Sequence, residues 1–284
     1  MSLRCEGHCE NTRVSGSPRL VTTPRISASA YSNTAPLVWS FLYGQNRGRI
    51  EIILDNAPAR SAELLEQDRV DAALVPVIAY QTLPDVKLIP GVCVGAKERV
   101  RSVCLVTKGE ELADVRSVAL DTSSRTSVAL TKIIFREFLN REPEFRPTAP
   151  DLSEMLTSAD AALIIGDPSL TVNARPAGLR VFDLAELWRS YTGLGFIFAM
   201  WMTRRDSVAI DFASVRDEGL AHLDEISASY ATNLPLDPAE IRQYLSENIV
   251  YTPDDSMLKG MALYFTLAHK HGLIKRNMPL AFVT

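Results

Sequence analysis

From Arg25 onward, short runs of branched apolar residues alternate with longer segments whose apolar residues recur every three or four positions. Runs of the first kind predict strands, and segments of the second kind predict helices. The first strands are expected in RISASA, RIEIILD and VDAALVPV, and the helices beside them in NTAPLVWSFLYG and APARSAELLEQDR. This alternation predicts an α/β fold, in which helices cover both faces of a sheet.

A second block repeats the alternation after a strand expected in VRSVCLVTKG. The segments SVALD, TSSRTSVALTKIIFREFL, EFRPT, DLSEMLTS and ADAALIIGD predict a compact βαβαβ unit. A strand within residues 193–203 and mainly helical segments follow. We therefore expect two lobes that cross near residues 106–109 and 193–198: lobe 1 from residues 25–106 and 197–284, and an inserted lobe 2 from residues 107–196. A ligand cleft is expected between them, because small-molecule sites favour domain interfaces.

The composition favours a packed enzyme or binding protein. With 284 residues, 46% of them hydrophobic and 23% charged, the chain has the content of an ordinary globular protein. Its 34 acidic residues outnumber its 30 basic ones, so no basic field holds a polyanion and no nucleic acid is expected as a partner. The longest apolar stretches, such as residues 193–202, are shorter than the roughly 20 residues that span a bilayer, so no membrane partner is expected.

Residues 1–24 contain several arginines but no helical period and no apolar run of the length that a secretory signal needs. We expect a disordered tail there and a cytoplasmic protein. The four cysteines, Cys5, Cys9, Cys93 and Cys104, are too few to staple a chain of this size and are expected to be reduced thiols. His8 lies close to Cys5 and Cys9, but no second ligand cluster follows at zinc-site spacing, so no metal is expected.

The most polar candidate site is LDTSSRTS, residues 120–127, which leads from a predicted strand into a predicted helix. Free backbone N–H groups and the helix dipole favour an anion at such a helix start. The candidate binding residues are Thr122, Ser123, Ser124, Arg125, Thr126 and Ser127. A small carboxylate fits better than a nucleotide, because no glycine-rich phosphate loop is present. In the alternative, Thr122 or Ser123 merely caps the helix.

Other polar candidates lie at expected strand ends or within a strand. SASAYSNTAPL places Tyr31 and Asn33 where the chain leaves a strand, at the edge where open α/β sheets bind ligands. Asn33 has the alternative role of a simple N-cap. Ser102 is a hydroxyl in an otherwise apolar strand, and Asp167 follows the apolar run in LIIGDP. Asp167 is expected either to line the cleft or to cap the turn after it.

Several enzyme classes lack their motifs. The sequence contains no HExxH, GxSxG, paired CxxC or GxGxxG, which leaves zinc proteases, α/β-hydrolases, metal fingers and Rossmann cofactor sites without support. The histidines are His8, His222, His269 and His271, and none of them belongs to lobe 2. A histidine base in that lobe is therefore excluded.

Five segments, SASAYSNTAPL, VDAALVPVIAY, LDTSSRTSVALTKII, ADAALIIGDPSL and DLAELWRSYTGLGFIFAMW, together resemble the MqnA family, the chorismate dehydratases of the futalosine route to menaquinone. The resemblance runs in order from about Arg25 to the C-terminus. It implies a two-lobed periplasmic-binding-protein type 2 fold retained in the cytoplasm as a carbon–oxygen lyase. The implied substrate is chorismate and the implied products are 3-(1-carboxyvinyloxy)benzoate and water. No metal and no organic cofactor are implied.

By the same resemblance, Asn33 in the YxNTxPL turn and Ser102 in the SVxL strand are the catalytic polar pair. They are expected to hydrogen-bond the departing hydroxyl and the enolpyruvyl carboxylate, while residues 122–127 hold a substrate carboxylate. The proton acceptor stays open, with a substrate carboxylate as one candidate, and so does the oligomeric state. Ser32 and Ala35 replace bulkier leucines of the family, and the acidic residue often found before Tyr80 is missing, which changes the expected pocket wall.

Three other functions share parts of this pattern. A non-catalytic carboxylate receptor of the same fold would have the same anion site, and a turnover assay separates the two. The sister enzyme of the MqnD type, which cleaves a cyclised futalosine, is similar in fold but uses a histidine base in its cleft. A transcription-factor effector domain would be expected to carry a helix-turn-helix segment before Arg25.

Overall fold

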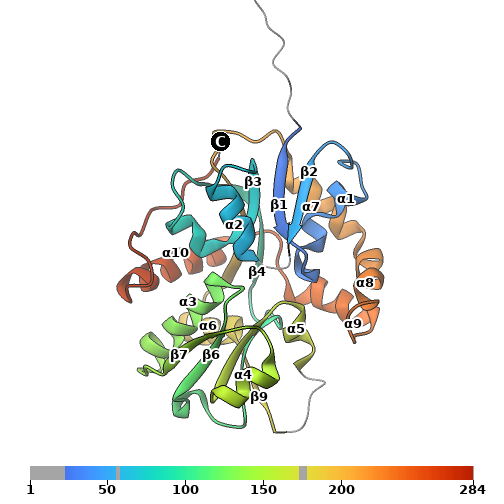
Figure 1. Ribbon diagram of the computed structural model, residues 1–284. Coiled ribbons are helices and arrows are strands. Elements are labelled where there is room, and N and C mark those ends of the chain that lie inside the picture. The colour runs from blue at the N-terminus through green and yellow to red at the C-terminus, as the bar shows by residue number, and fades with distance from the viewer. Residues whose placement is uncertain (1–22, 56–57, 173–177, 284) are drawn as a thin grey trace, which may run out of the picture.

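The computed structural model describes residues 23–55, 58–172 and 178–283, which form two five-stranded sheets with helices packed around them (Figure 1). The α/β class predicted from the sequence is confirmed. Residues 1–22 of the expected tail, with Cys5, His8 and Cys9, lie outside the described residues, so what was expected of them stays a prediction.

The first sheet combines the beginning of the chain with one late strand. Its order is β2-β1-β3-β10-β4, with β1 parallel to β2 and β3, and with β10 antiparallel to β3 and β4. The strands are β1 (Arg25–Ser29), β2 (Glu51–Asp55), β3 (Ala72–Pro76), β4 (Lys87–Ala96) and β10 (Phe196–Thr203). β3 is buried along its whole length, which explains why its sequence is a continuous apolar run rather than an alternation.

The second sheet is built from the middle of the chain, in the order β7-β6-β8-β5-β9. The strands are β5 (Val103–Thr107), β6 (Ser117–Asp121), β7 (Glu144–Thr148), β8 (Ala161–Ile165) and β9 (Arg180–Asp183). β6 is parallel to β7 and β8, as expected for a βαβαβ unit, and β5 is antiparallel to β8 and β9. Because β5 already belongs to this sheet, the predicted boundary between residues 106 and 107 falls inside a strand. The first crossing lies earlier, after β4, since local apolar content cannot tell to which sheet a strand belongs.

The helices differ from the predicted ones mainly at their ends. They are α1 (Trp39–Leu42), α2 (Pro58–Glu66), α3 (Arg125–Ile133), α4 (Leu152–Ser158), α5 (Asp167–Leu170), α6 (Leu184–Thr192), α7 (Phe212–Ala221), α8 (Leu223–Ala231), α9 (Pro238–Gln243) and α10 (Asp255–Lys270). The described residues also contain the 3₁₀ turns η1 (Ser32–Leu37), η2 (Val77–Gln81) and η3 (Leu112–Asp114) and the π turns η4 (Ile134–Phe138) and η6 (Tyr244–Asn248).

One predicted helix is divided. The segment NTAPLVWSFLYG forms η1 followed by the short α1, because Pro36 lies inside η1 and has no backbone N–H to continue a regular helical ladder. β4 was not predicted, since it contains Pro90 and Gly91, residues that are depleted in strands. β4 lies at the edge of its sheet, where a proline is tolerated.

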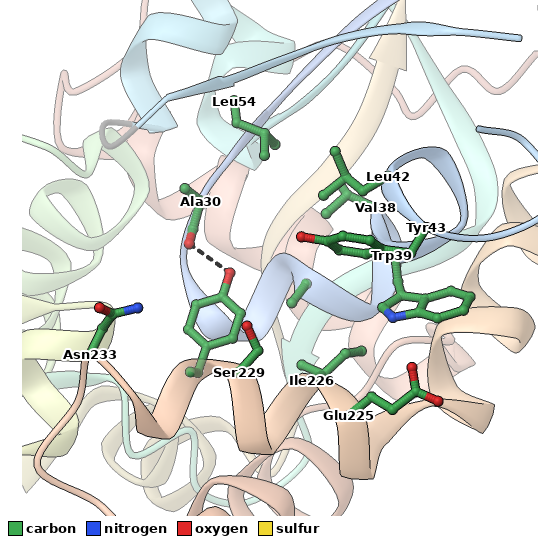
Figure 2. Close-up of a pocket in the computed structure, with 12 residues that line it drawn as sticks. Ala30, Val38, Trp39, Leu42, Tyr43, Leu54, Glu225, Ile226, Ser229 and Asn233 are labelled. Atoms are coloured by element: carbon green, nitrogen blue, oxygen red, sulfur yellow. Dashed lines mark hydrogen bonds between the residues drawn. The ribbon is translucent and has the colours of Figure 1, made fainter. Parts of the chain in front are cut away.

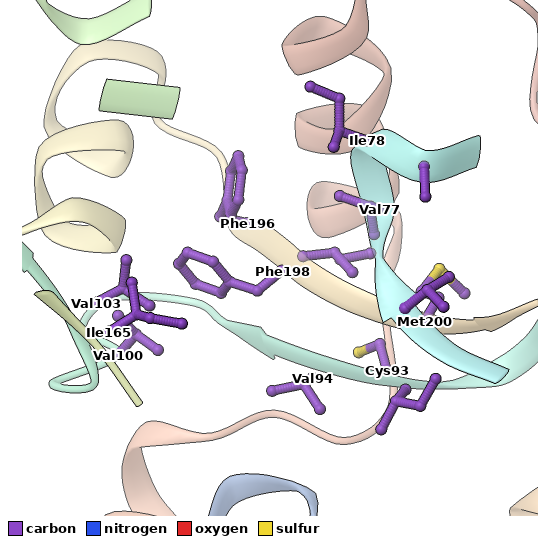
Figure 3. Close-up of a cluster of buried hydrophobic side chains, with 14 of the residues drawn as sticks. Val77, Ile78, Cys93, Val94, Val100, Val103, Ile165, Phe196, Phe198 and Met200 are labelled. Atoms are coloured by element: carbon purple, nitrogen blue, oxygen red, sulfur yellow. The ribbon is translucent and has the colours of Figure 1, made fainter. Parts of the chain in front are cut away.

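Apolar side chains from both sheets meet where the chain crosses between them (Figure 3). Val103 and Ile165 of the second sheet belong to the same buried cluster as Phe196 and Phe198 of β10 in the first sheet. The C-terminal helix also joins the two parts, because the Tyr264 hydroxyl of α10 donates to the carbonyl oxygen of Thr126 over 3.1 Å. One large buried cluster therefore spans both sheets, and a second, smaller cluster lies in the second sheet beneath α4.

Replacing Gly219 by alanine is expected to lower the free energy of unfolding by about 2 to 3 kcal/mol, as overpacked sites do. α7 lies so close to η1 that a Cβ at Gly219 would stand 1.9 Å from the carbonyl oxygen of Pro36. Urea denaturation measures the change. The exposed Ser214→Ala substitution in the same helix is the control and should change the stability by less than about 0.5 kcal/mol. Equal stabilities for the two variants would contradict the close contact between α7 and η1.

Candidate active site

A cavity of about 60 Å³ lies between the two sheets, at the carboxyl ends of β1, β3 and β8. Five residues predicted from the sequence line it, namely Tyr31, Asn33, Ser102, Ser124 and Ser127. They come from the chain before β5 and from the start of α3, so the fold brings residues of both sheets to one place. This is the edge at which open α/β sheets bind ligands.

Asn33 is the second residue of η1 and is half-buried in the cavity wall. The turn is anchored by its neighbour Thr34, whose hydroxyl donates to the carbonyl oxygens of Ser29 over 2.5 Å and of Tyr31 over 2.8 Å. η1 begins one residue before Asn33 without any side-chain cap, so the alternative that Asn33 is an N-cap is wrong. Its amide lies close enough to the buried phenol of Tyr244 to lower the pKa of that phenol.

Ser102 lies just before β5, at the end of a tight turn, rather than inside the strand as predicted. The turn places Arg101 at a φ of 59°, a left-handed conformation that is uncommon for a residue with a side chain. The buried carboxylate of Asp183 holds this turn, because it accepts the backbone N–H of Arg101 over 2.6 Å and that of Val100 over 3.1 Å. The fully buried Ser102 is therefore fixed in place by a residue that is distant in the sequence.

Ser124 is the N-cap of α3, where its Oγ accepts the backbone N–H of Ser127 over 3.2 Å. The two hydroxyl groups also contact each other over 2.8 Å. The alternative that Thr122 or Ser123 caps this helix is therefore wrong, although one hydroxyl does cap it. Ser124 and Ser127 still line the cavity and keep the start of α3 within reach of a ligand.

Thr122 and Ser123 do not line the cavity. Thr122 is exposed. Ser123 donates its backbone N–H over 2.9 Å and its hydroxyl over 2.6 Å to Oδ1 of Asp121. Asp121 was not predicted as a site residue. It binds the N–H and hydroxyl of Ser123 that were expected to bind a ligand.

Arg125 and Thr126 connect the lobes instead of lining the cavity. The Arg125 guanidinium lies 3.9 Å from the carboxylate of Glu63 in α2. The Thr126 hydroxyl oxygen accepts the backbone N–H of Ile78 in η2 over 3.3 Å. Both contacts hold α3 against the first sheet.

Asp167 and Tyr31 form a second connection between the lobes. The Asp167 carboxylate accepts the backbone N–H of Ser32 over 3.1 Å and also the Ser32 hydroxyl. Asp167 therefore neither lines the cavity nor caps its own turn, because its carboxylate binds the start of η1 in the other lobe. The ring of Tyr31 covers Gly166, where an added Cβ would stand 2.9 Å from it.

Within the described part of the chain, no charged side chain lines the cavity. A carboxylate ligand would meet hydroxyl groups, an amide and the positive end of α3. Asp121 and Asp167 lie near this wall, and burial raises the pKa of each carboxyl group, with hydrogen bonds from Ser123 and Ser32 opposing the rise. A raised pKa favours the neutral acid, which is the form that repels a bound anion least.

The Asp121→Asn substitution is expected to make stability less dependent on pH. Because the pKa of Asp121 is raised in the folded protein, the folded state binds the proton more tightly, and stability is lost as the pH rises from about 4 through the folded-state pKa. Urea denaturation across acidic pH should show a smaller fall in the free energy of unfolding with rising pH for the variant than for the unsubstituted protein.

Asp254→Asn is the control for this pH series. The backbone N–H of Met257 and the Lys97 ammonium hold the pKa of Asp254 below its usual range. Its charged form therefore adds stability that is lost as the pH falls, so removing it should change the slope in the opposite direction. A slope for Asp121→Asn equal to that of the unsubstituted protein would show that Asp121 titrates normally.

A larger cavity of about 520 Å³ lies outside this site, between η1, α1 and α8 (Figure 2). It is lined mainly by apolar side chains and by Trp39, Tyr43 and Tyr230, and the Tyr230 hydroxyl is already bound to the carbonyl oxygen of Ala30 over 2.8 Å. None of the residues predicted as site residues lines it. Its charged side chain is Glu225, which would repel a carboxylate, so the smaller cavity, which no charged side chain of the described ranges lines, is the better anion site.

Other chemistry finds little support in the described ranges. Cys93 and Cys104 are free and buried, and burial raises the pKa of the Cys104 thiol to about 12, which keeps it from acting as a thiolate. No group of three or more histidine, cysteine, aspartate or glutamate side chains is arranged to hold a metal in residues 23–55, 58–172 and 178–283. No helix in those ranges is long and apolar enough to cross a membrane.

Comparison with known sequences identifies relatives over most of the chain. A sequence model of a family described by its role in menaquinone biosynthesis matches residues 24–270. A chorismate dehydratase from Thermus thermophilus is 33% identical over 238 residues, which cover 76% of this chain and 84% of that protein.

Comparison with solved structures supports the fold. The aliphatic sulphonate binding protein SsuA of Escherichia coli superimposes with a TM-score of 0.62 at 16% identity, over 90% of this chain and 89% of that one. A Candida albicans protein described as having the generic periplasmic binding protein fold gives a TM-score of 0.64 at 11% identity, over 93% and 98% of the two chains. The predicted periplasmic-binding-protein fold is thus confirmed, and the sequence matches show that the chain belongs to the menaquinone biosynthesis family.

Proposed function

We propose that this protein is a chorismate dehydratase, a carbon–oxygen lyase that converts chorismate to 3-(1-carboxyvinyloxy)benzoate and water. The observation that carries the proposal is the meeting of Asn33 and Ser102 in the wall of one small cavity that no charged side chain of the described ranges lines. The similarity to a chorismate dehydratase supports the choice of substrate. A biosynthetic family also supports the cytoplasm as the place of the reaction.

The reaction removes a ring proton and the neighbouring hydroxyl, which leaves an aromatic ring. Because aromatisation makes the step strongly downhill, the enzyme mainly has to orient the dianion and assist one proton and one departing hydroxide. Asn33 and Ser102 can hydrogen-bond the departing hydroxyl and the enolpyruvyl carboxylate. The hydroxyls of Ser124 and Ser127 and the start of α3 can hold a carboxylate.

The proton acceptor is proposed to be a carboxylate of the substrate itself. No histidine, aspartate, glutamate or lysine of the described ranges lines the cavity. His222 stacks on Trp39 at a ring distance of 3.7 Å, and His271 lies 2.7 Å from the Glu137 carboxylate, so neither is available there. The same facts argue against the MqnD-type lyase, which needs a histidine in its cleft.

Substrate entry is proposed to require that the two lobes separate. A cavity of about 60 Å³ is far smaller than the roughly 300 Å³ or more that small-molecule sites usually offer. The contacts of Asp167 with Ser32 and of Thr126 with Ile78 would open as the lobes part to admit the ligand. We propose that lobe 2 moves as one unit in this step.

The proposed function is tested by incubating the purified protein with chorismate and analysing the products by chromatography and mass spectrometry. The expected product has lost one water and carries an aromatic ring. Unchanged chorismate with a well-folded protein would contradict the dehydratase and favour a carboxylate receptor.

A further inference from the structure

Tyr244 is a fully buried tyrosine next to the proposed catalytic pair, and nothing in the local sequence pattern singles it out. It is the first residue of the π turn η6, which follows α9, and only 1% of its surface is exposed. π turns are rare and often occur at functional sites. The position of this side chain therefore indicates a role beyond core packing.

The hydroxyl of Tyr244 is buried, yet it has no hydrogen-bond partner among the described residues. The Ser102 hydroxyl and the Asn33 amide lie close enough to lower the pKa of the phenol, although neither makes a hydrogen bond with it. The Ser102 hydroxyl is itself weakly bound, since it reaches the carbonyl oxygen of Val100 only over 3.4 Å. Buried polar groups normally have partners, so this incomplete cluster at the wall of a cavity indicates a ligand that completes it.

We infer that Tyr244 is a positioning residue for the proposed dehydration: once the substrate is bound, its phenol, which has no partner in the structure described above, donates to Oγ of Ser102 and directs the Ser102 proton into the cavity, toward the departing hydroxyl. Hydrogen bonds arranged in such a chain polarise one another, so the Ser102 proton becomes a stronger donor. The hydroxide that leaves takes up the proton that the ring carbon loses. Tyr244 and Ser102 therefore keep their own protons over the complete reaction.

The phenol is suited to this role because it stays protonated. Burial raises the pKa of Tyr244 well above its usual range, and the nearby carboxylate of Asp167 raises it further. The interactions with Ser102, Asn33 and Arg101 lower this pKa only in part. Tyr244 thus remains a hydrogen-bond donor at any pH at which the protein would work.

The inference rests on the proposed function and is tested by comparing Tyr244→Phe with Tyr251→Phe in the chorismate assay. Tyr251 is a second buried tyrosine whose hydroxyl lacks a partner in the described ranges; it lies near Tyr244 but does not line the cavity. Both substitutions remove only one hydroxyl. We expect Tyr244→Phe to lower kcat by about 10- to 100-fold with KM within about threefold. Tyr251→Phe should leave both constants unchanged, and both variants should keep the urea midpoint of the unsubstituted protein.

A double substitution tests whether Tyr244 acts through Ser102. In the Ser102→Ala background, Tyr244→Phe should cause no further loss of kcat, because the group that it positions is gone. Equal kcat values for the two single phenylalanine variants, or an additive loss in the double variant, would overturn the role of Tyr244. A rise in KM together with a fall in the urea midpoint, common to both single variants, would also overturn it, because this is a merely structural effect. An unsubstituted protein that does not consume chorismate would refute the proposed function itself, and with it this role.

Discussion

Replacing Asn33 by alanine is expected to lower kcat/KM for chorismate by about 100- to 1,000-fold, the effect of removing one donor that stabilises developing charge. Asn33 is the amide that η1 brings to the cavity wall, and no other amide side chain lines this cavity in the described ranges. Ser102→Ala should cause a loss of similar size. Because the two groups act on one substrate, the double variant should lose less than the product of the two single effects.

The matched control for Asn33→Ala is Asn233→Ala, which makes the same chemical change in the larger cavity beside Trp39. This variant should keep kcat/KM within about twofold, since surface substitutions away from a site have small effects. Steady-state kinetics with both variants therefore also distinguishes the two cavities. A large loss of kcat/KM for Asn233→Ala, together with an unchanged kcat/KM for Asn33→Ala, would place the reaction in the larger cavity and contradict the proposed site.

Replacing Asp183 by asparagine is expected to lower the free energy of unfolding by about 3 kcal/mol and kcat/KM by about 10- to 100-fold. The Asp183 carboxylate accepts the N–H groups of Val100 and Arg101 in the turn before Ser102, and those of Ala185 and Glu186 at the start of α6. An amide keeps one acceptor oxygen but turns N–H groups toward one of these two sets of donors. The left-handed turn at Arg101 then loses its anchor, and Ser102 moves with it.

Asp151→Asn is the control for this experiment. Asp151 is also a helix N-cap, for α4, and its Oδ1 accepts the N–H groups of Ser153 and Glu154 over 2.9 and 3.1 Å. It is exposed and serves one helix only, and asparagine is an equally good cap, so its stability should stay within about 0.5 kcal/mol. Urea denaturation and the turnover assay are measured on both variants. If Asp183→Asn is as stable and as active as Asp151→Asn, the Asp183 carboxylate does not hold Ser102 in place.

The polar strand ends were predictable because both the residue types and their positions indicate a ligand site there. SASAYSNTAPL and LDTSSRTS put hydroxyls and an amide directly after apolar strands, and the structure places Asn33, Ser124 and Ser127 at one cavity. Ser102 alone was a weak signal, and its pairing with Asn33 followed from the family resemblance. A local pattern cannot specify which strand ends of two lobes meet.

The supporting residues could not be predicted from the sequence for a physical reason. Asp183 follows a strand and precedes a helix, so it has the pattern of an ordinary N-cap, which it also is. Its second role depends on a turn more than eighty residues earlier in the chain. Tyr244 lies in a segment with ordinary helical spacing, where an aromatic residue indicates only a buried face. Its proximity to Ser102 and Asn33 arises only in the folded chain.

The central claim is that chorismate binds and loses water in the small cavity between the sheets, and not in the larger cavity beside Trp39. A crystal structure of the Asn33→Ala variant soaked with chorismate tests this most directly, because slow turnover leaves the substrate or its product in place. The account predicts the ligand between Ser102, Ser127 and the start of α3, with the lobes further apart than in the structure described above. A ligand bound against Trp39, Tyr43 and Asn233, with the cavity between the sheets unoccupied, would contradict it.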